Sequence, residues 1–557
     1  PGALTWLLLC VGFWPLMAYA SCTPYPITVP IGNVSLPNKQ IARGVEIQVG
    51  DPPQPFAFMP QWPLNNTFLY GPNGQCPSNE YHSVMSCTTK RGGAYDAFAS
   101  STRKQVDPAT YPIDSAPYPQ MSYVSESLRF NDNVSLGNFP VGVALNDWGA
   151  QGYHPTVAFG LGTNSTLLKT LKRSSKILSN TWGLFWGRNG GTTSSQLNGS
   201  IVFGGYDRAK VSGQKYVQAM SKNAGCSSRL VATISDMILN FPNGTNASIF
   251  PSSQSTALAA CIVPDYPTLL TLPLDPYVNT FQRMTGMNND LERSLGLNFF
   301  SIKYTRASSA NNVNSYGGDL TIQLQSGLSV RVPNDQLVVP DVIIVRPTGA
   351  LVVNGSAPDL VINSIQDVNA NDLPQLGRQF LTAAYLMVNM DADQFTLWSA
   401  NPTSDQDLVA VDTSNQEVTE YCGTGQSSLN NSGDGPESGS DPSSTATGSS
   451  ASSRTRLIAG AVAGSIGGVL LIVSTTVYIL GRRKRINKER RVSGRNPIQP
   501  AMPPYYGEAP PYSSPPQKSW QQQYKAELPG DEAIYEEQRR NQTFPPSASH
   551  HRYELGG

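Results

Sequence analysis

The 557-residue sequence has little charge and little histidine. Charged residues make up 14% of the chain, and the formal net charge is +0. No basic stretch with interleaved aromatic residues occurs before residue 450, which argues against a nucleic-acid partner. His82 and His154 are the only histidines in that part. The chain also lacks H-E-x-x-H, G-x-S-x-G and phosphate-loop motifs, so no zinc peptidase, serine hydrolase or P-loop nucleotide-binding protein is indicated, and we expect no metal or cofactor.

The N-terminus indicates export from the cytoplasm. Residues 1–20 are an apolar segment ending in Ala18-Tyr19-Ala20, a small-x-small pattern typical of signal-peptide cleavage sites. The first residue is not Met and no basic region precedes the apolar one, so the expected signal peptide is shortened at its start. Residues 21–39 form a short segment before the expected folded domain.

Sequons and cysteines fit a secreted surface. Nine N-x-S/T sequons lie between residues 21 and 456, at Asn33, Asn65, Asn133, Asn164, Asn198, Asn243, Asn246, Asn354 and Asn430. Six cysteines remain after the signal peptide, namely Cys22, Cys76, Cys87, Cys226, Cys261 and Cys422. An even count in an exported chain predicts disulfides, with fifteen connectivities open. Only the local pair Cys76 and Cys87 is favoured by proximity in sequence.

An uncharged apolar run at residues 457–480 predicts one transmembrane helix. Basic residues follow at once, at 482–485, so the N-terminal part is expected outside and the tail in the cytoplasm, at the plasma membrane or another secretory-pathway membrane. Gly460, Gly464 and Gly468 recur every four residues, which indicates either a helix-dimerisation face or the ordinary glycine content of membrane helices.

Two low-complexity segments flank this span. Residues 423–456 are rich in Ser, Gly and Thr, a composition typical of disordered, O-glycosylated stalks. Residues 481–557 are rich in Pro, Gln and Tyr and are also expected to be disordered. In this tail Pro503, Pro504 and Tyr506 fit a PPxY motif, which is either a docking site for a WW-domain ubiquitin ligase or a coincidence of composition.

Residues 40–422 form the expected folded ectodomain, and their patterns are mostly β. Val45, Ile47 and Val49 alternate with polar residues before a turn at Gly50, and a second apolar run follows at 56–59. Residues 319–332 predict another hairpin, turning near Gly327. Helices are predicted at 165–174 and 275–286, the second with Asp275 as its N-cap and Pro276 in its first turn.

Five phrases in this region together resemble pepsin-like aspartic proteases. They are VGDPPQPFAFM (49–59), TVAFGLGTNSTLLKTL (156–171), GSIVFGGYDRAKVSG (199–213), CIVPDYPTLLTLPLDPYVNTF (261–281) and LGRQFLTAAYLMVNMDADQFTLW (376–398). Their order and spacing match the family's across essentially all of 40–422. The resemblance implies two similar β lobes with a peptide cleft between them.

The same resemblance indicates that the catalytic acids are missing. The family uses two aspartates, one per lobe, that share a proton and activate water. Gln61 and Pro264 occupy the matching positions, and neither side chain can ionise. The neighbouring Asp265 is one residue out of register, and Trp62 beside Gln61 is expected to place an aromatic ring on the cleft floor. Asp412, in the only D-T-S triplet, lacks matching flanks.

These features predict a catalytically inactive, aspartic-protease-like surface protein that binds a peptide, protein or glycan. Two alternatives stay open. An active membrane-anchored aspartic endopeptidase would require Asp265 to meet a second carboxylate. A structural wall sensor or adhesin would not need the cleft at all.

Overall fold

The computed structural model describes most of the chain between residues 22 and 422. The described residues are 22–77, 83–107, 120–147, 155–189, 196–222, 225–250, 257–264, 266–287, 292–304, 315–365 and 369–422. The chain divides into two compact units, Pro1–Asn431 and Ser432–Gly557, and all described residues belong to the first. Within these ranges, no helix is both long and apolar enough to cross a bilayer.

Several sequence predictions therefore lie outside the described residues. These are the signal peptide, the stalk, the membrane span and the cytoplasmic tail, together with His82, His154, Asp265, Asn430, Gly460, Gly464, Gly468, Pro503, Pro504 and Tyr506.

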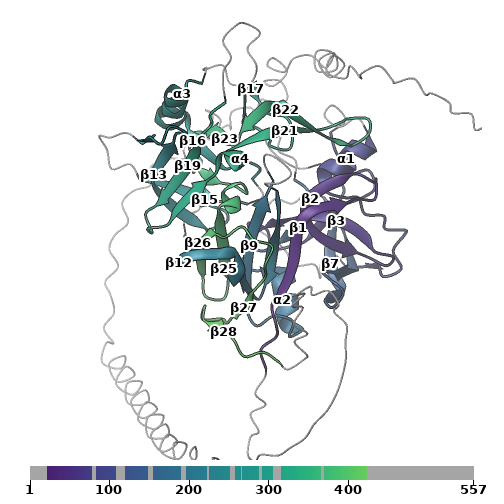
Figure 1. Cartoon of the computed structure of the whole chain (residues 1–557). Coiled ribbons are helices and arrows are strands. Elements are labelled where there is room, and N and C mark those ends of the chain that lie inside the picture. The colour runs from purple at the N-terminus through teal and green to yellow at the C-terminus, as the bar shows by residue number, and fades with distance from the viewer. Residues whose placement is uncertain are drawn as a thin grey trace, which may run out of the picture. The chain divides into compact units, whose positions relative to one another are not determined.

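β-strands dominate the described residues, as the alternating patterns predict. The largest sheet has the order β12-β26-β25-β9-β10-β1-β2-β3-β8-β4-β7-β6-β5 (Figure 1). Its strands are β1 (Ile27–Ser35), β2 (Ile41–Val49), β3 (Gln54–Gln61), β4 (Phe68–Tyr70), β5 (Lys104–Gln105), β6 (Met121–Arg129), β7 (Ser135–Ala144), β8 (Ala158–Gly160), β9 (Thr181–Arg188), β10 (Leu197–Phe203), β12 (Val211–Ala219), β25 (Ala384–Asn389) and β26 (Gln394–Ala400).

Three smaller sheets complete the unit. One has the order β20-β19-β13-β15-β24-β16-β23 with β14 beside β13, the second β17-β18-β22-β21 and the third β11-β27-β28. Their strands are β11 (Gly205–Asp207), β13 (Val231–Asn240), β14 (Asn246–Ser248), β15 (Leu258–Ile262), β16 (Leu270–Pro273), β17 (Glu292–Arg293), β18 (Ile302–Lys303), β19 (Asp319–Leu324), β20 (Ser329–Val332), β21 (Val338–Ile344), β22 (Leu351–Leu360), β23 (Ile362–Ile365), β24 (Gln375–Leu376), β27 (Leu408–Val411) and β28 (Glu417–Val418).

The helices are short. They are α1 (Val84–Arg91), α2 (Thr166–Arg173), α3 (Asn279–Thr285) and α4 (Asn334–Leu337), with single turns η3 (Arg208–Lys210), η4 (Leu274–Val278) and η6 (Phe380–Thr382). The helix predicted at 165–174 is confirmed as α2, which Ser165 caps by accepting from Leu168 N at 3.2 Å. The helix predicted at 275–286 divides into the π turn η4 and α3. Its predicted Asp275 cap is wrong, because neither element has a side-chain cap hydrogen bond.

Both predicted hairpins are confirmed. In the first, Val45 of β2 pairs with Phe58 of β3, and the alternating side chains of β2 are buried. Gly50 makes the turn with a φ of +83°, and a Cβ at this position would lie 2.7 Å from Ser100 Oγ. Glycine is therefore required there by both conformation and space. In the second hairpin, Leu320 of β19 pairs with Val332 of β20.

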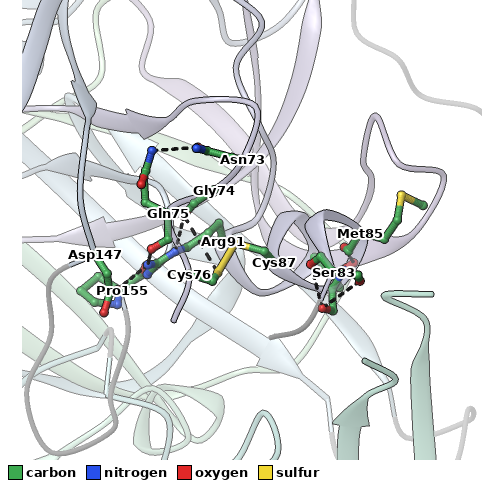
Figure 2. The surroundings of a disulfide bond; sticks show 12 residues. Asn73, Gly74, Gln75, Cys76, Ser83, Met85, Cys87, Arg91, Asp147 and Pro155 are labelled. Carbon is green, nitrogen blue, oxygen red and sulfur yellow. Dashed lines mark hydrogen bonds and ion pairs between the residues drawn. A yellow bond between two sulfur atoms is a disulfide. The ribbon is translucent and has the colours of Figure 1, made fainter. Parts of the chain in front are cut away.

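Three disulfides use all six cysteines of the described residues. Cys76–Cys87 is the local bridge that the sequence favours, and it ties the loop before α1 to that helix (Figure 2). Cys226–Cys261 confirms that Cys261 is a disulfide partner. Cys22–Cys422 joins residues 400 positions apart.

The bridge Cys22–Cys422 brings the two ends of the ectodomain together. Beside it, Thr23 forms a parallel bridge with Tyr421, and Cys422 N donates to Thr23 O at 3.0 Å. The largest of three hydrophobic clusters extends through the unit from Ile27 to Leu397. Residues 22–422 thus carry their own core and their own closure, which is what independent folding requires.

Candidate functional site

The two halves of the unit contain the same four-strand arrangement. In the first half, β8 pairs with β3 in parallel and with β4 antiparallel, while β4 pairs with β7 in parallel. In the second half, β24 pairs with β15 in parallel and with β16 antiparallel, while β16 pairs with β23 in parallel. The chain therefore repeats one β arrangement, with the ends of β3 and β15 at matching places.

The register makes Gln61 and Pro264 equivalent. Ala158 of β8 pairs with both Met59 and Phe68, and Leu376 of β24 pairs with Ile262 and Leu270 in the same pattern. Met59 thus corresponds to Ile262, and the residues two positions later are Gln61 and Pro264.

Both of these positions are buried. Gln61 is 4% exposed, and its carbonyl accepts from Leu161 N at 2.8 Å. Pro264 lies in a turn in which Tyr266 N donates to Val263 O at 3.0 Å. An amide side chain and a pyrrolidine ring provide no group that exchanges a proton with water near neutral pH.

Trp62 connects the two halves at these strand ends. Its indole Nε1 donates to the carbonyl of Ile262 at 3.2 Å, across 200 residues of sequence. Its ring packs on Trp182 with 4.9 Å between ring centroids. Trp62 is only 2% exposed, so the predicted wedge on an open cleft floor is wrong. The indole is instead a structural contact within the core, because its size fills the junction and its one donor satisfies a buried carbonyl.

A pair of buried aspartates lies elsewhere, at the β21–β22 hairpin. Asp341 accepts from Ser294 Oγ at 2.9 Å, and Asp359 accepts from Asn298 Nδ2 at 3.1 Å. Lys303 Nζ lies 3.7 Å from the Asp341 carboxylate. Burial, and next the charge of Asp341, raises the pKa of Asp359 to about 8. The sequence motifs gave no signal for this pair, since the two residues are not flanked by any family phrase.

A cavity of about 250 Å³ lies between the N-terminal strands, α1 and the β21–β22 hairpin. The hairpin's connecting loop reaches α1, where Thr89 Oγ1 donates to Gly349 O at 2.8 Å. Figure 1 shows β21 and β22 beside α1 in this region. Three cations line the cavity, Arg43, Lys90 and Arg378, and none of its described lining residues is acidic.

Arg43 and Arg378 lie against the same aromatic ring. Their guanidinium carbons are 5.9 and 5.6 Å from the ring centroid of Trp186. Arg43 Nη2 donates to Trp186 O at 2.9 Å and to Leu197 O at 3.2 Å. Burial, and next the charge of Arg378, lowers the pKa of Arg43 to about 10, so Arg43 stays cationic at neutral pH.

Three residues that line this cavity each have a buried polar atom without a hydrogen-bond partner. These atoms are Arg43 Nε, Gln379 Oε1 and Asn189 Oδ1, and Gln379 is only 1% exposed. Such atoms are rare in folded proteins, because an unsatisfied buried polar group costs free energy. Sequence reasoning missed this site, since its residues come from many separate segments between Asn33 and Gln379 and match no motif.

The predicted glycosylation sites differ in accessibility. Asn65 is half-buried, and its Oδ1 accepts from Asn164 N at 2.8 Å, while Asn354 is also half-buried. The exposed sequon residues are Asn33, Asn133, Asn164, Asn198, Asn243 and Asn246. No group of three or more His, Cys, Asp or Glu side chains within the described ranges is arranged to hold a metal ion.

The comparisons with known proteins give a likeness in structure and none in sequence. No family model matches the sequence, and no curated protein matches it. Among solved structures, the aspartic proteinase from Irpex lacteus matches with 15% sequence identity and a TM-score of 0.41, covering 69% of this chain and 100% of that one.

Proposed function

We propose that this chain is a catalytically inactive, aspartic-protease-like protein of the cell surface. Its ectodomain binds a ligand through the cavity between the halves, and its tail serves sorting or signalling. The pepsin-like resemblance of residues 40–422 supports the architecture. The predicted signal peptide and apolar span support a place at the plasma membrane or another membrane of the secretory pathway.

The observation that carries the proposal is the equivalence of Gln61 and Pro264. Aspartic protease chemistry needs two carboxylates that share one proton, so that one accepts a proton from water while the other stays neutral. At the two equivalent strand ends, the residues are an amide and a proline. The neighbouring Trp62 fills the junction between the halves, so the space between these strand ends is occupied by a packed side chain.

The lining of the cavity supports binding as the retained activity. The Arg43 guanidinium, which has no acidic neighbour among the cavity's described lining residues, and the unsatisfied polar atoms are costly for folding alone. A ligand that offers an anion to the guanidinium and hydrogen bonds to the unsatisfied atoms would offset that cost.

The proposal is tested by an activity assay on the purified ectodomain, residues 22–422. The substrate is a denatured protein at acid pH, with and without a pepstatin-type inhibitor. We expect no inhibitor-sensitive cleavage. Cleavage that follows the ectodomain through purification and is blocked by the inhibitor would show that the proposal is wrong.

The variant Asp265→Asn separates true activity from contamination, because the active alternative depends on this carboxylate. If wild-type protein cleaves and the identically purified Asp265→Asn protein does not, the chain is an active endopeptidase. Equal cleavage by both proteins indicates a contaminating protease.

A further inference from the structure

The cavity that contains Arg43 is chemically unlike an ordinary packing gap. It has three cationic side chains, no acid among its described lining residues, and unsatisfied atoms of both kinds, donor and acceptor. Building on the proposed function, we propose that this cavity binds a peptide through a carboxylate, with apolar side chains of the peptide on the adjoining wall.

The carboxylate is assigned by Arg43. This guanidinium makes two hydrogen bonds, both from Nη2 to backbone carbonyls, and its Nε has no partner. The charged group next to it is another arginine, Arg378. A half-buried cation without an acid is costly, and a carboxylate supplies oxygens that accept from the donors that Arg43 has left, Nε among them.

Two unsatisfied acceptors of the cavity residues indicate that the ligand has a peptide backbone. Gln379 Oε1 and Asn189 Oδ1 line the same cavity without a donor. An inorganic anion at neutral pH offers them few or no donors, whereas a peptide brings N–H groups next to its carboxylate. One ligand class therefore supplies both the negative charge for Arg43 and the donors for the two amides.

The apolar wall favours a peptide over an acidic glycan. Phe299, Leu351 and Val353 line the cavity, and Val353 is 63% exposed. Ile41, also at the cavity, is among the exposed large hydrophobic residues. The Trp186 ring already lies against two guanidinium groups, which makes it less available for stacking on a sugar. The cavity of about 250 Å³ fits one or two side chains, so the expected motif is short.

The test begins with a random heptapeptide display library selected on immobilised ectodomain. We expect enrichment of peptides in which Asp, Glu or a free C-terminal carboxylate neighbours apolar residues. The enriched peptide is then titrated by calorimetry beside a set of twin peptides. Each twin carries one change, either a Glu or Asp replaced by its amide or an amidated C-terminus. These twins distinguish a side-chain carboxylate from the terminal one.

Variants of the ectodomain locate the site. Arg43→Met should weaken binding of the enriched peptide by at least about tenfold, as expected when a charge-assisted contact is lost. Lys90→Gln, near the end of α1, should weaken it by a smaller factor, and this variant leaves Arg43 unaltered. Arg208→Met is the matched control, because this exposed residue lies outside the cavity, and it should bind as wild type does.

Three outcomes would overturn the inference. Enriched peptides without an acidic preference, or selected equally by Arg43→Met, would show that a peptide binds elsewhere while the proposed binding function stands. Binding of oligogalacturonate but of no peptide would assign an acidic glycan instead. Retention of wild-type affinity by both Arg43→Met and Lys90→Gln would show that these two cations do not contact the peptide. Inhibitor-sensitive proteolysis, in contrast, is the result that would overturn the proposed function itself.

Discussion

Arg91, which is fully buried, and Arg43, which is half-buried, are two arginines of the same unit with opposite surroundings. Arg91 is fully buried at the end of α1, and it donates to Gly74 O at 2.9 Å, to Pro155 O at 2.7 Å and to Gln75 O at 2.8 Å. It also forms an ion pair with Asp147, and Figure 2 shows these contacts converging on the guanidinium. Arg43 has two carbonyl acceptors and a neighbouring arginine.

The difference distinguishes a structural charge from a charge available to a ligand. The acceptors around Arg91 all belong to the chain, and its guanidinium carbon also lies 4.0 Å from the Tyr70 ring centroid. That charge is thus neutralised and solvated by the fold. Arg43 keeps an unused donor and its net charge in a cavity without described acids. We therefore expect Arg91 to serve stability, and under the proposed function we expect Arg43 to serve binding.

The largest effect is expected for Arg91→Met. The substitution removes the donor to three backbone carbonyls and one ion-pair partner of Asp147. We expect the free energy of unfolding to fall by about 3–5 kcal/mol, as for other broken buried ion pairs. Denaturant unfolding of the ectodomain measures this loss. A loss of less than about 1 kcal/mol would contradict the structural role of Arg91.

Trp62→Phe tests whether a neutral buried donor, whose acceptor is also a group of the protein, contributes to stability as Arg91 does. The variant keeps an aromatic ring against Trp182 and deletes the hydrogen bond to Ile262 O. We expect a loss of about 1–3 kcal/mol, because a buried carbonyl loses its donor. Thermal melts with circular dichroism measure the change. Trp398→Phe, at a buried indole outside this junction, is the control for ring size alone. Equal losses of stability in both variants would show that the effect comes from the smaller side-chain volume and not from the lost hydrogen bond.

Asp359→Asn extends the comparison to a buried carboxylate beside a like charge. The raised pKa of Asp359 means that the folded state holds a proton that the unfolded state releases, so stability is full below about pH 4 and falls as the pH rises toward 8. At pH 8 the variant should be more stable than wild type by about 1–2 kcal/mol, since Asn is neutral and still accepts from Asn298.

The measurement is the free energy of unfolding of both proteins from pH 4 to 8. The groups that face Asp359 are Asp341, Lys303, Asn298 and Ser294, and all of them stay in place in the variant. Asp405→Asn, at an exposed residue, should leave the wild-type pH dependence unchanged. An unchanged slope in Asp359→Asn would mean that Asp359 is ionised throughout.

The smallest effect on stability is expected for Arg43→Met. The substitution loses two carbonyl hydrogen bonds but also removes the repulsion between two cations. These changes oppose each other, so we expect the free energy of unfolding to change by less than about 1 kcal/mol in either direction. The same denaturant titration as for Arg91→Met measures it. A loss as large as that of Arg91→Met would assign Arg43 to the fold rather than to a ligand.

The sequence by itself determined the local structure of the described residues. Alternating apolar residues place β2 and β3, and a Ser-capped amphipathic run places α2, because burial periodicity is a property of neighbouring residues. The equivalence of Gln61 and Pro264 was also visible, since the phrases that flank them keep a fixed spacing. The local bridge Cys76–Cys87 needed only proximity along the chain.

Only the tertiary structure decided which distant groups meet. It paired Cys22 with Cys422, moved Trp62 from an expected cleft floor into the core, and set Arg43 beside Arg378. The same closure surrounded Arg91 with acceptors and left Arg43 without an acid. These contacts depend on how strands far apart in sequence close on one another, and no local pattern encodes that separation. The residue types are set by the sequence, but whether a charge serves the fold or a ligand depends on the partners that folding brings to it.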